Sequence, residues 1–207
     1  MTNTTILSEV SDYYIDKLIR YGETPKGVDW NGEESQLLRF IQLTKIIETT
    51  EPFSLNDLGC GYGALFKYLK NNHQNFEYYG CDIASAMIDA ATARYSDYDD
   101  AHFKISNKPE NTVDYSVASG IFNVRLKYGD AEWQNYLMDM LNILNECSKK
   151  GFSFNCLTSH SDADRMRDYL YYADPCWLFD LCKKRYSRNV ALLHDYDLYE
   201  FTILVRK

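Results

Sequence analysis

The sequence predicts an α/β fold: a seven-stranded, mostly parallel β-sheet with helices on both faces and a helical cover at its N-terminal end. Apolar strand patterns alternate with amphipathic helix patterns along most of the chain, an order that produces a parallel sheet. A glycine-rich turn at residues 59–63 joins the first strand to a helix. The last two strands are separated by only a short link, so we expect an antiparallel hairpin at the sheet edge.

Two amphipathic helices are expected before the first strand. Apolar residues recur three or four positions apart over Leu7–Tyr21, and Gly22 then marks a stop. A loop over Glu23–Gly32 and a second helix over Glu34–Thr49 follow. We expect residues 1–50 to cover a ligand pocket on a core formed by residues 53–207, the two parts together making one domain.

The core is expected to alternate strands with helices. The expected strands are Phe53–Asp57, Phe76–Asp82, Ala101–Ile105, Val113–Ser119, Gly151–Leu157, Asn189–His194 and Tyr199–Val205. The expected helices are Ala64–Lys70, Ser85–Tyr95, Trp133–Lys149, a helical segment around Asp162–Tyr172, and Pro175–Arg185. Asp174 and Pro175 form a favourable start for the last helix, a capping side chain followed by proline in the first turn.

Composition narrows the class of protein. The chain has 207 residues, enough for one α/β domain, with a net charge of −8. That acidity argues against sequence-independent binding of nucleic acid, which relies on basic patches. No apolar run approaches the roughly 20 residues of a membrane span, and the first residues lack the pattern of a signal peptide. We therefore expect a cytoplasmic protein with no nucleic-acid or membrane partner, and leave its oligomeric state open.

The six cysteines contain no C-x-x-C pair, and four lie in apolar strand or helix patterns. We interpret them as small buried hydrophobic residues of a reducing compartment. No metal site is expected.

The segment Ser54–Ala64 carries the clearest functional signal. Gly59, Gly61 and Gly63 let the backbone turn sharply and come close to a ligand that a Cβ would exclude. The helix that follows points free N–H groups at the same place. Asp57 adds a carboxylate that can accept hydrogen bonds from a cationic or hydroxyl-rich ligand. A purely structural tight turn is the alternative interpretation of these glycines.

The stretch Asp57–Gly63, reading DLGCGYG, resembles the first motif of class I S-adenosylmethionine-dependent methyltransferases. The resemblance covers roughly Phe53–Lys207 and implies a Rossmann-like fold with an antiparallel seventh strand and S-adenosyl-L-methionine as cofactor. A nicotinamide-dependent oxidoreductase competes, since Gly59, Gly61 and Ala64 also satisfy G-x-G-x-x-G/A. That alternative needs a donor such as Tyr-x-x-x-Lys on a suitable later helix, which the sequence lacks.

The resemblance implies further cofactor contacts at the C-terminal ends of the strands, where open parallel sheets bind ligands. Asp82 ends the second strand and would accept hydrogen bonds from the two ribose hydroxyls; capping of the helix at Ser85 is the alternative. Ile83 and Met87 would flank the adenine.

Two more cofactor contacts are expected, one at the end of the fourth strand and one on the helix before the first strand. Gly120, after the fourth strand, would give close backbone contact. Arg39, on the helix before the first strand, would pair with the cofactor carboxylate, with a solvated arginine as the alternative. The predicted cofactor-binding residues are Asp57, Gly59, Cys60, Gly61, Asp82, Ile83, Met87, Gly120 and Arg39.

Three polar residues are candidates for the methyl-transfer site: Asn123, His160 and His194, which follow the fourth, fifth and sixth strands. Methyl transfer from a sulfonium is an in-line displacement, so the protein supplies alignment and, for an oxygen nucleophile, a base. Histidine titrates near neutral pH, and His194 is the preferred base; Asn123 would face substrate or hold its loop.

We therefore expect a methyltransferase that acts on a small molecule, at oxygen. A non-catalytic S-adenosylmethionine-binding or regulatory module is the alternative. Such a module would keep the glycine turn and Asp82 but would need no polar groups at the three later strand ends.

Overall fold

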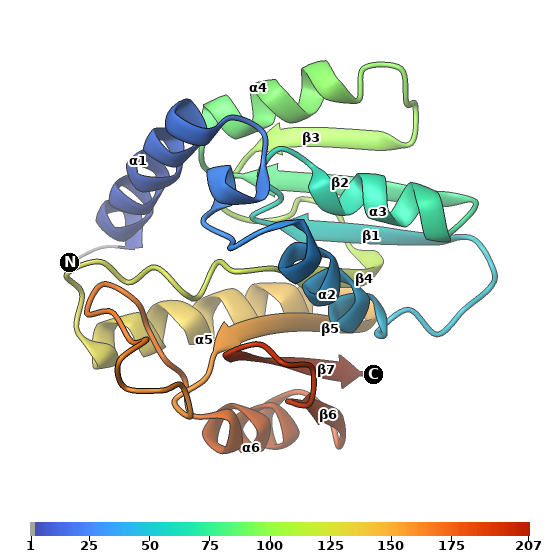
Figure 1. Ribbon diagram of the computed structural model, residues 1–207. Helices are drawn as coiled ribbons and strands as arrows, with labels where there is room; N and C mark the ends of the chain where they lie inside the picture. The colour runs from blue at the N-terminus through green and yellow to red at the C-terminus, as the bar shows by residue number, and fades with distance from the viewer. Residues whose placement is uncertain (1–2) are drawn as a thin grey trace.

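The computed structural model describes residues 3–207 and contains one seven-stranded sheet with helices on both faces (Figure 1). The strands are β1 (Phe53–Leu58), β2 (Phe76–Asp82), β3 (Ala101–Ile105), β4 (Val113–Ala118), β5 (Ser148–Leu157), β6 (Asn189–Leu193) and β7 (Glu200–Arg206). The helices are α1 (Asn3–Tyr21), α2 (Glu33–Thr44), α3 (Ala64–Asn72), α4 (Ser85–Arg94), α5 (Asp130–Glu146) and α6 (Pro175–Arg185), with a 3₁₀ turn, η1, at Pro25–Val28. The predicted Rossmann-like fold class is confirmed.

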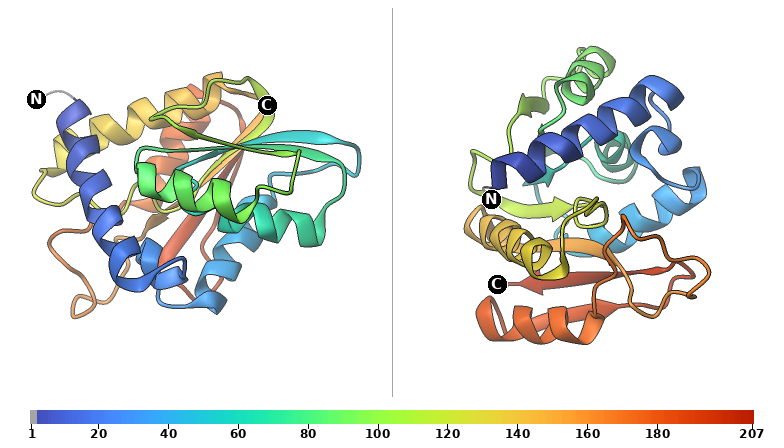
Figure 2. Two further views of the ribbon diagram at one scale, coloured as in Figure 1. Left: turned by 90° about the horizontal axis from the view of Figure 1, so that it is seen from above. Right: turned by 90° about the vertical axis from the view of Figure 1, so that its left-hand side faces the viewer.

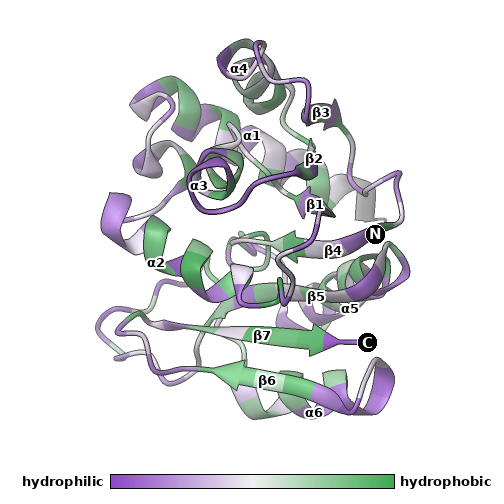
Figure 3. Cartoon of the chain, turned by 90° about the vertical axis from the view of Figure 1, so that its right-hand side faces the viewer, coloured by the Kyte–Doolittle hydropathy of each residue, from purple (hydrophilic) through white to green (hydrophobic). Residues whose placement is uncertain are grey.

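The strand order is β3-β2-β1-β4-β5-β7-β6. Strands β1 to β5 are parallel, and β7 is antiparallel to both β5 and β6, so the predicted C-terminal hairpin is confirmed. Strand β7, not β6, occupies the interior position. Burial follows this order: six of the seven residues of β7 are buried, whereas β6 is only partly covered. Hydrophobic residues fill the C-terminal half of β7 (Figure 3).

Two hydrophobic layers enclose the sheet. Apolar residues of α2 and α3 pack on one face, together with Tyr95 at the end of α4. Helices α5 and α6 pack on the other face, joined there by Ile6 and Val10 of α1. Helix α1 and η1 lie across the edge at which the parallel strands end (Figure 2). The N-terminal segment thereby forms the wall of a site at the ligand-binding edge of the sheet.

One predicted helix is wrong. Residues 162–172 form turns and an irregular loop, with an isolated bridge between Leu170 and Val124. The backbone N–H groups of Arg125 and Leu126 donate to the carbonyl of Tyr169, so this segment bonds to a neighbouring loop and has only isolated turn bonds of its own, such as that from Arg165 to Asp162.

Other boundaries shift by a few residues. Helix α2 ends at Thr44, five residues before its predicted end, and the hydroxyl of Thr44 donates to the carbonyl of Phe40. Gly22 ends α1 with φ +66°, as predicted. Asp174 caps α6 by accepting hydrogen bonds from the N–H groups of Cys176 and Trp177. None of the described helices combines the length and apolar character needed to cross a membrane.

An aromatic cluster anchors α3 to the sheet. The ring of Phe66 is fully buried and lies 5.3 Å from Tyr78 and 5.0 Å from Tyr95 between ring centroids. We expect Phe66→Ala to lower the free energy of unfolding by about 3–5 kcal/mol, because the truncation leaves a cavity among rings that cannot close over it. Urea denaturation measures the change. Ile19→Ala is the control, since Ile19 is 78% exposed; equal losses in the two variants would contradict this account of the core.

Candidate active site

The glycine turn after β1 is locked to the end of β2. The N–H groups of Gly59 and Cys60 both donate to the carbonyl of Cys81, at 2.8 and 3.1 Å. Gly59 has φ +76°, and a Cβ there would lie 2.2 Å from the side chain of Ile121. Gly61 has φ +54° and faces the cover, where a Cβ would lie 3.2 Å from Val28. The backbone conformation therefore favours glycine at both positions, and at Gly59 the lack of space requires it as well.

Asp82 holds this turn in place from the end of β2. One carboxylate oxygen accepts from the N–H of Gly61 and the other from the N–H of Ala84, each at 2.9 Å. The bond to Ala84 reaches the N-cap residue of α4, so Asp82 also holds the start of that helix, and the two interpretations of Asp82 are compatible with its position. Burial raises the pKa of Asp82 against the lowering effect of these bonds. Each oxygen keeps acceptor capacity for a ligand hydroxyl.

Asp57 presents an incompletely bonded carboxyl group beneath the turn. Its Oδ2 accepts from the hydroxyl of Tyr78 at 2.6 Å, and its Oδ1 has no hydrogen-bond partner among the described residues. Burial raises the pKa of Asp57 to about 7. A buried acceptor without a donor is costly, so Asp57 marks a place where a ligand donor or cation would be stabilised.

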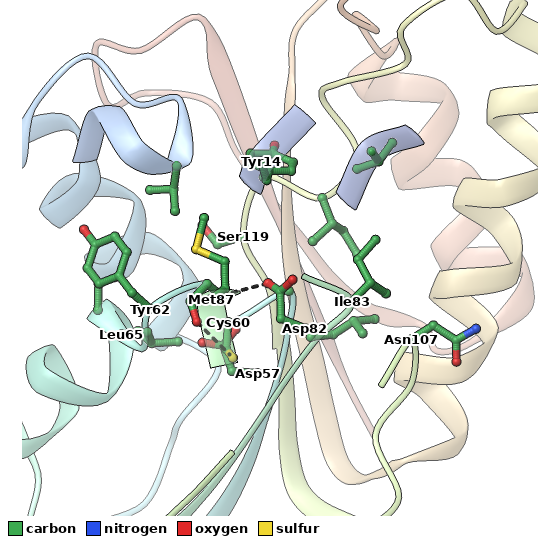
Figure 4. A pocket seen from close by; sticks show the side chains of 18 of the residues that line it. Tyr14, Asp57, Cys60, Tyr62, Leu65, Asp82, Ile83, Met87, Asn107 and Ser119 are labelled. Carbon is green, nitrogen blue, oxygen red and sulfur yellow. Dashed lines mark hydrogen bonds between the residues drawn. The ribbon is translucent and has the colours of Figure 1, made fainter. Parts of the chain in front are cut away.

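These groups line a cavity, here called the inner pocket, between the strand ends and the N-terminal cover (Figure 4). Every predicted cofactor residue except Arg39 lines it, namely Asp57, Gly59, Cys60, Gly61, Asp82, Ile83, Met87 and Gly120. The pocket also includes residues that the sequence did not single out for it: Leu7, Val10, Val28, Gln36, Phe40, Ser119, Tyr136 and Met140. Most of these are apolar, so their periodicity signals only a buried face.

A second cavity of about 450 Å³, here called the outer pocket, adjoins the first. Four residues line both: Tyr14, Val28, Trp30 and Gly120. Tyr14 comes from α1 and Trp30 from the loop before α2, so the N-terminal cover supplies part of this junction. Residues of the 157–172 segment and the approach to β7 form the far wall.

Asn123 lines the outer pocket and also holds its loop. Its Oδ1 accepts from the N–H of Leu157 at 3.2 Å, and its backbone carbonyl accepts from the N–H of Tyr171. Because the oxygen is used in this way, the amide N–H₂ is left as a donor toward the pocket. Both predicted roles of Asn123 are therefore compatible with its position.

The two histidines lie outside the site. His160 and His194 are exposed, their ring centroids are 6.0 Å apart, and neither lines the inner or the outer pocket. Partial burial, with a smaller effect of His160, lowers the pKa of His194. Both histidines lie at the predicted edge of the sheet, but their side chains do not line either pocket. Neither pocket therefore contains a histidine base.

The structure pairs Arg39 with a residue of the protein, which differs from the prediction that it pairs with the cofactor. It lines the outer pocket, 5% exposed, and its Nε and Nη2 donate to the two carboxylate oxygens of Glu200 at 2.7 and 2.6 Å. Its guanidinium also stacks 3.7 Å from the ring centre of Trp30. The arginine is therefore paired within the protein, and the predicted contact with a cofactor carboxylate finds no support. Local sequence could not reveal this pairing, because Glu200 lies 161 residues from Arg39 in the sequence.

Glu200 completes a closed chain of contacts, here called the polar ring. Asn155 donates from Nδ2 to Glu200 at 3.2 Å and accepts at Oδ1 from the N–H of Gly120 at 2.8 Å. A Cβ on Gly120 would lie 2.7 Å from the ring of Trp30. Contacts thus run from Gly120 through Asn155, Glu200, Arg39 and Trp30 back to Gly120. No group of three or more His, Cys, Asp or Glu residues able to hold a metal occurs within residues 3–207.

Comparisons with known proteins agree with this geometry. Residues 56–146 match the family model described as "Methyltransferase domain". A Mycobacterium tuberculosis (strain ATCC 25618 / H37Rv) protein named "Putative methyltransferase Rv1506c" is 58% identical over 163 residues, which are 79% of this chain and 98% of that protein.

Solved structures resemble the whole fold at low sequence identity. Magnesium protoporphyrin IX methyltransferase from Synechocystis PCC 6803, with bound SAH, has a TM-score of 0.66 at 11% identity over all of both chains. A structure described as "DhpI-SAM-HEP complex" has a TM-score of 0.67 at 12% identity, also over all of both chains.

An order of strands ending in 5-7-6, together with a glycine turn between two carboxylates, defines a class I S-adenosylmethionine-dependent methyltransferase. The chain belongs to this methyltransferase family. The competing interpretation as a nicotinamide-dependent oxidoreductase is therefore wrong.

The raised pKa of Asp57 predicts how stability depends on pH. The folded protein holds this proton up to about pH 7, whereas the unfolded chain releases it near pH 4. Folding stability from this group therefore falls as pH rises from about 4 to 7 and is level above that. We expect Asp57→Asn to remove this fall and to unfold at higher temperature than wild type at pH 8. Calorimetric melting from pH 4 to 8 measures it; parallel curves for the two proteins would refute the assignment.

The buried ion pair predicts an asymmetric mutational result. Arg39→Met leaves Glu200 charged, buried and without its partner, so we expect a loss of about 3–5 kcal/mol in unfolding free energy. The double variant Arg39→Met/Glu200→Leu removes both charges and should recover most of that loss. Urea denaturation of the two single variants and the double variant tests this. Losses that simply add would show that the pair carries no coupling.

Proposed function

We propose that this methyltransferase holds S-adenosyl-L-methionine in the inner pocket and methylates a small molecule, at oxygen, in the outer pocket. The junction of the two pockets at Tyr14, Val28, Trp30 and Gly120 is the observation that carries the proposal. A transferred group needs its donor and acceptor in contact, and these four residues surround the place at which the two cavities meet.

The residues of the inner pocket fit that cofactor. S-adenosyl-L-methionine supplies a methyl group on a positively charged sulfonium. The unpartnered Oδ1 of Asp57 suits the cofactor's ammonium group, and the carboxylate of Asp82 suits vicinal ribose hydroxyls. Ile83 and Met87 offer apolar surface for the adenine. Cys60 and Gly61 let the backbone approach closely.

The outer pocket favours an enzyme over a non-catalytic binding module. A module that only senses the cofactor needs no second cavity, whereas this chain builds one with buried polar walls. Asn123 contributes one of these walls, and the polar ring contributes another. The acidic net charge and the enclosed position of the pocket under the N-terminal cover support a small molecule over nucleic acid as acceptor.

Calorimetry tests the cofactor assignment. We expect S-adenosyl-L-methionine and S-adenosylhomocysteine to bind at micromolar strength, and Gly61→Val to abolish binding because its side chain would enter the inner pocket. Gly129→Val is the matched control, since Gly129 has ordinary backbone angles and a Cβ there meets nothing within 4 Å. Circular dichroism checks that both variants fold. Retained binding by a folded Gly61→Val protein would contradict the proposal that the cofactor lies against the glycine turn.

A further inference from the structure

We propose that the acceptor is a small carboxylic acid, and that its carboxylate is methylated directly, without a protein base, to give a methyl ester. The inference rests on the proposed function, because it names the substrate class of the same outer pocket. Three features carry it: the junction lacks a base, two of the three carboxylates that line the outer pocket are paired within the protein, and the pocket offers amide and guanidinium donors.

The junction between the pockets is poor in proton acceptors. Among the described residues, those that line both cavities are Tyr14, Val28, Trp30 and Gly120, and only Tyr14 titrates. Burial, with the nearby carboxylates of Asp29 and Asp82, raises the pKa of Tyr14, so its hydroxyl stays protonated. An alcohol or an ammonium group would have to lose a proton at this point, and nothing at the junction accepts it.

Two carboxylates that line the outer pocket, those of Asp29 and Glu200, are paired with other residues of the protein. Asp29 accepts from the hydroxyl of Tyr13 and pairs with Lys17, each at 2.6 Å. Glu200 is held in the polar ring by Arg39 and Asn155.

Three other acidic groups each line only one of the two pockets. Asp57 and Asp82 line only the inner pocket, where Asp82 supports the glycine turn. Asp197 lines the outer pocket from an exposed loop before β7. The histidines lie outside, so the junction favours an acceptor that is already ionised at neutral pH, as a carboxylic acid is.

Beside the carboxylate of Asp197, the outer pocket offers amide and guanidinium donors. The amide N–H₂ of Asn123 remains available because its oxygen is used by Leu157. Arg165 and Arg167 line the same pocket from the 157–172 segment. The nearest carboxylate to Arg165 is Asp164 at 3.9 Å, and Arg167 donates only to backbone carbonyls.

The charge of the pocket follows from these pairings. Asp29 and Glu200 are paired with Lys17 and Arg39, so the other charged residues that line the pocket are Arg165, Arg167 and Asp197, with Arg165 also 3.9 Å from Asp164. Arg167 has no carboxylate partner among the described residues, and its positive charge attracts an anion. Guanidinium and amide donors match the oxygens of a carboxylate.

The step balances without a proton. One carboxylate oxygen of the acceptor donates a lone pair to the methyl carbon, the carbon–sulfur bond breaks, and its electron pair stays on sulfur. A neutral methyl ester and neutral S-adenosylhomocysteine sulfur result, with no proton released. The protein's part is to align the oxygen at the junction and to exclude water with the cover.

Alkali lability of the product tests the proposal. The full chain is incubated with methyl-tritiated S-adenosyl-L-methionine and a small-molecule extract of cells that naturally produce it, and the products are treated with mild alkali. We expect the label to be released as volatile methanol, because esters hydrolyse whereas methyl ethers, amines and thioethers do not. Label that stays non-volatile overturns the carboxylate assignment and leaves the proposed function standing.

A parallel measurement separates the two failures. Binding of S-adenosylhomocysteine is measured by calorimetry on the same preparation. No binding overturns the proposed function itself. Binding without any labelled product overturns the carboxylate acceptor and favours the non-catalytic module.

Two variants place the carboxylate in the outer pocket once a labelled acid is isolated. Asn123→Asp keeps an oxygen for Leu157 but replaces the donor with a second oxygen, so we expect KM for the acid to rise tenfold or more. Asn142→Asp is the matched control, because Asn142 also accepts through Oδ1, from Tyr186, but lies outside both pockets. Binding of S-adenosylhomocysteine should be unchanged in both. Equal KM values would overturn the assignment.

The double variant Arg165→Gln/Arg167→Gln guards against misfolding at Asn123, because both arginines are exposed. We expect KM for the acid to rise with kcat little changed. Arg185→Gln/Arg188→Gln, on the exposed surface of α6 and the turn after it, is the control. An unchanged KM in the first pair overturns the role of the cationic wall.

Discussion

The buried pair of Arg39 and Glu200 is the interaction on which the site depends. It joins α2 of the N-terminal cover to β7 inside the sheet, and both side chains are almost completely removed from water. Such a pair is favourable only when the remaining donors and acceptors are also satisfied. Ser35, Asn155 and the face of Trp30 meet that condition. The wall shared by the two pockets is therefore fixed by electrostatics at one end of the sheet, while the core beneath is fixed by apolar packing.

The two pockets differ in the charged groups that line them. The inner pocket gathers two carboxyl groups, Asp57 and Asp82, whose ionised forms burial disfavours. A cationic ligand supplies the charge that would stabilise them, so the free protein carries a cost that binding relieves. The outer pocket has neutralised two of its acids internally and leaves guanidinium groups available. Under the proposals above, a positive donor molecule and a negative acceptor would lie on opposite sides of Trp30 and Gly120.

Much of this arrangement is local in sequence and could be predicted from it. The turn from Asp57 to Gly63, with Asp82 at the next strand end, is set by glycine conformation and strand order, and its members meet as expected. The antiparallel hairpin follows from a link too short for a crossover. Hydropathy does not distinguish the covered β7, EFTILVR, from the half-exposed β6, NVALL, and only the folded chain shows which strand is interior.

The features that failed depend on distant partners. Arg39 has the same local sequence whether it faces a ligand, solvent or Glu200, and only the folded chain decides. His194 follows the correct strand, yet its ring turns toward His160 and Phe201 instead of the pockets. The 162–172 loop owes its shape to hydrogen bonds with residues 123–126, which no local pattern records.

Because β7 lies between β5 and β6, the order in which the strands are synthesised differs from their order in the sheet. The glycine turn, Asp57 and Asp82 are all made within the first 82 residues of the chain, and their strands pair with each other. Arg39 is made earlier still, but Glu200 follows 161 residues later. Strand β6 likewise has no neighbour until β7 pairs with it. The glycine turn and its two carboxylates can therefore meet during synthesis before Glu200, which forms one wall of the outer pocket, has been added to the chain.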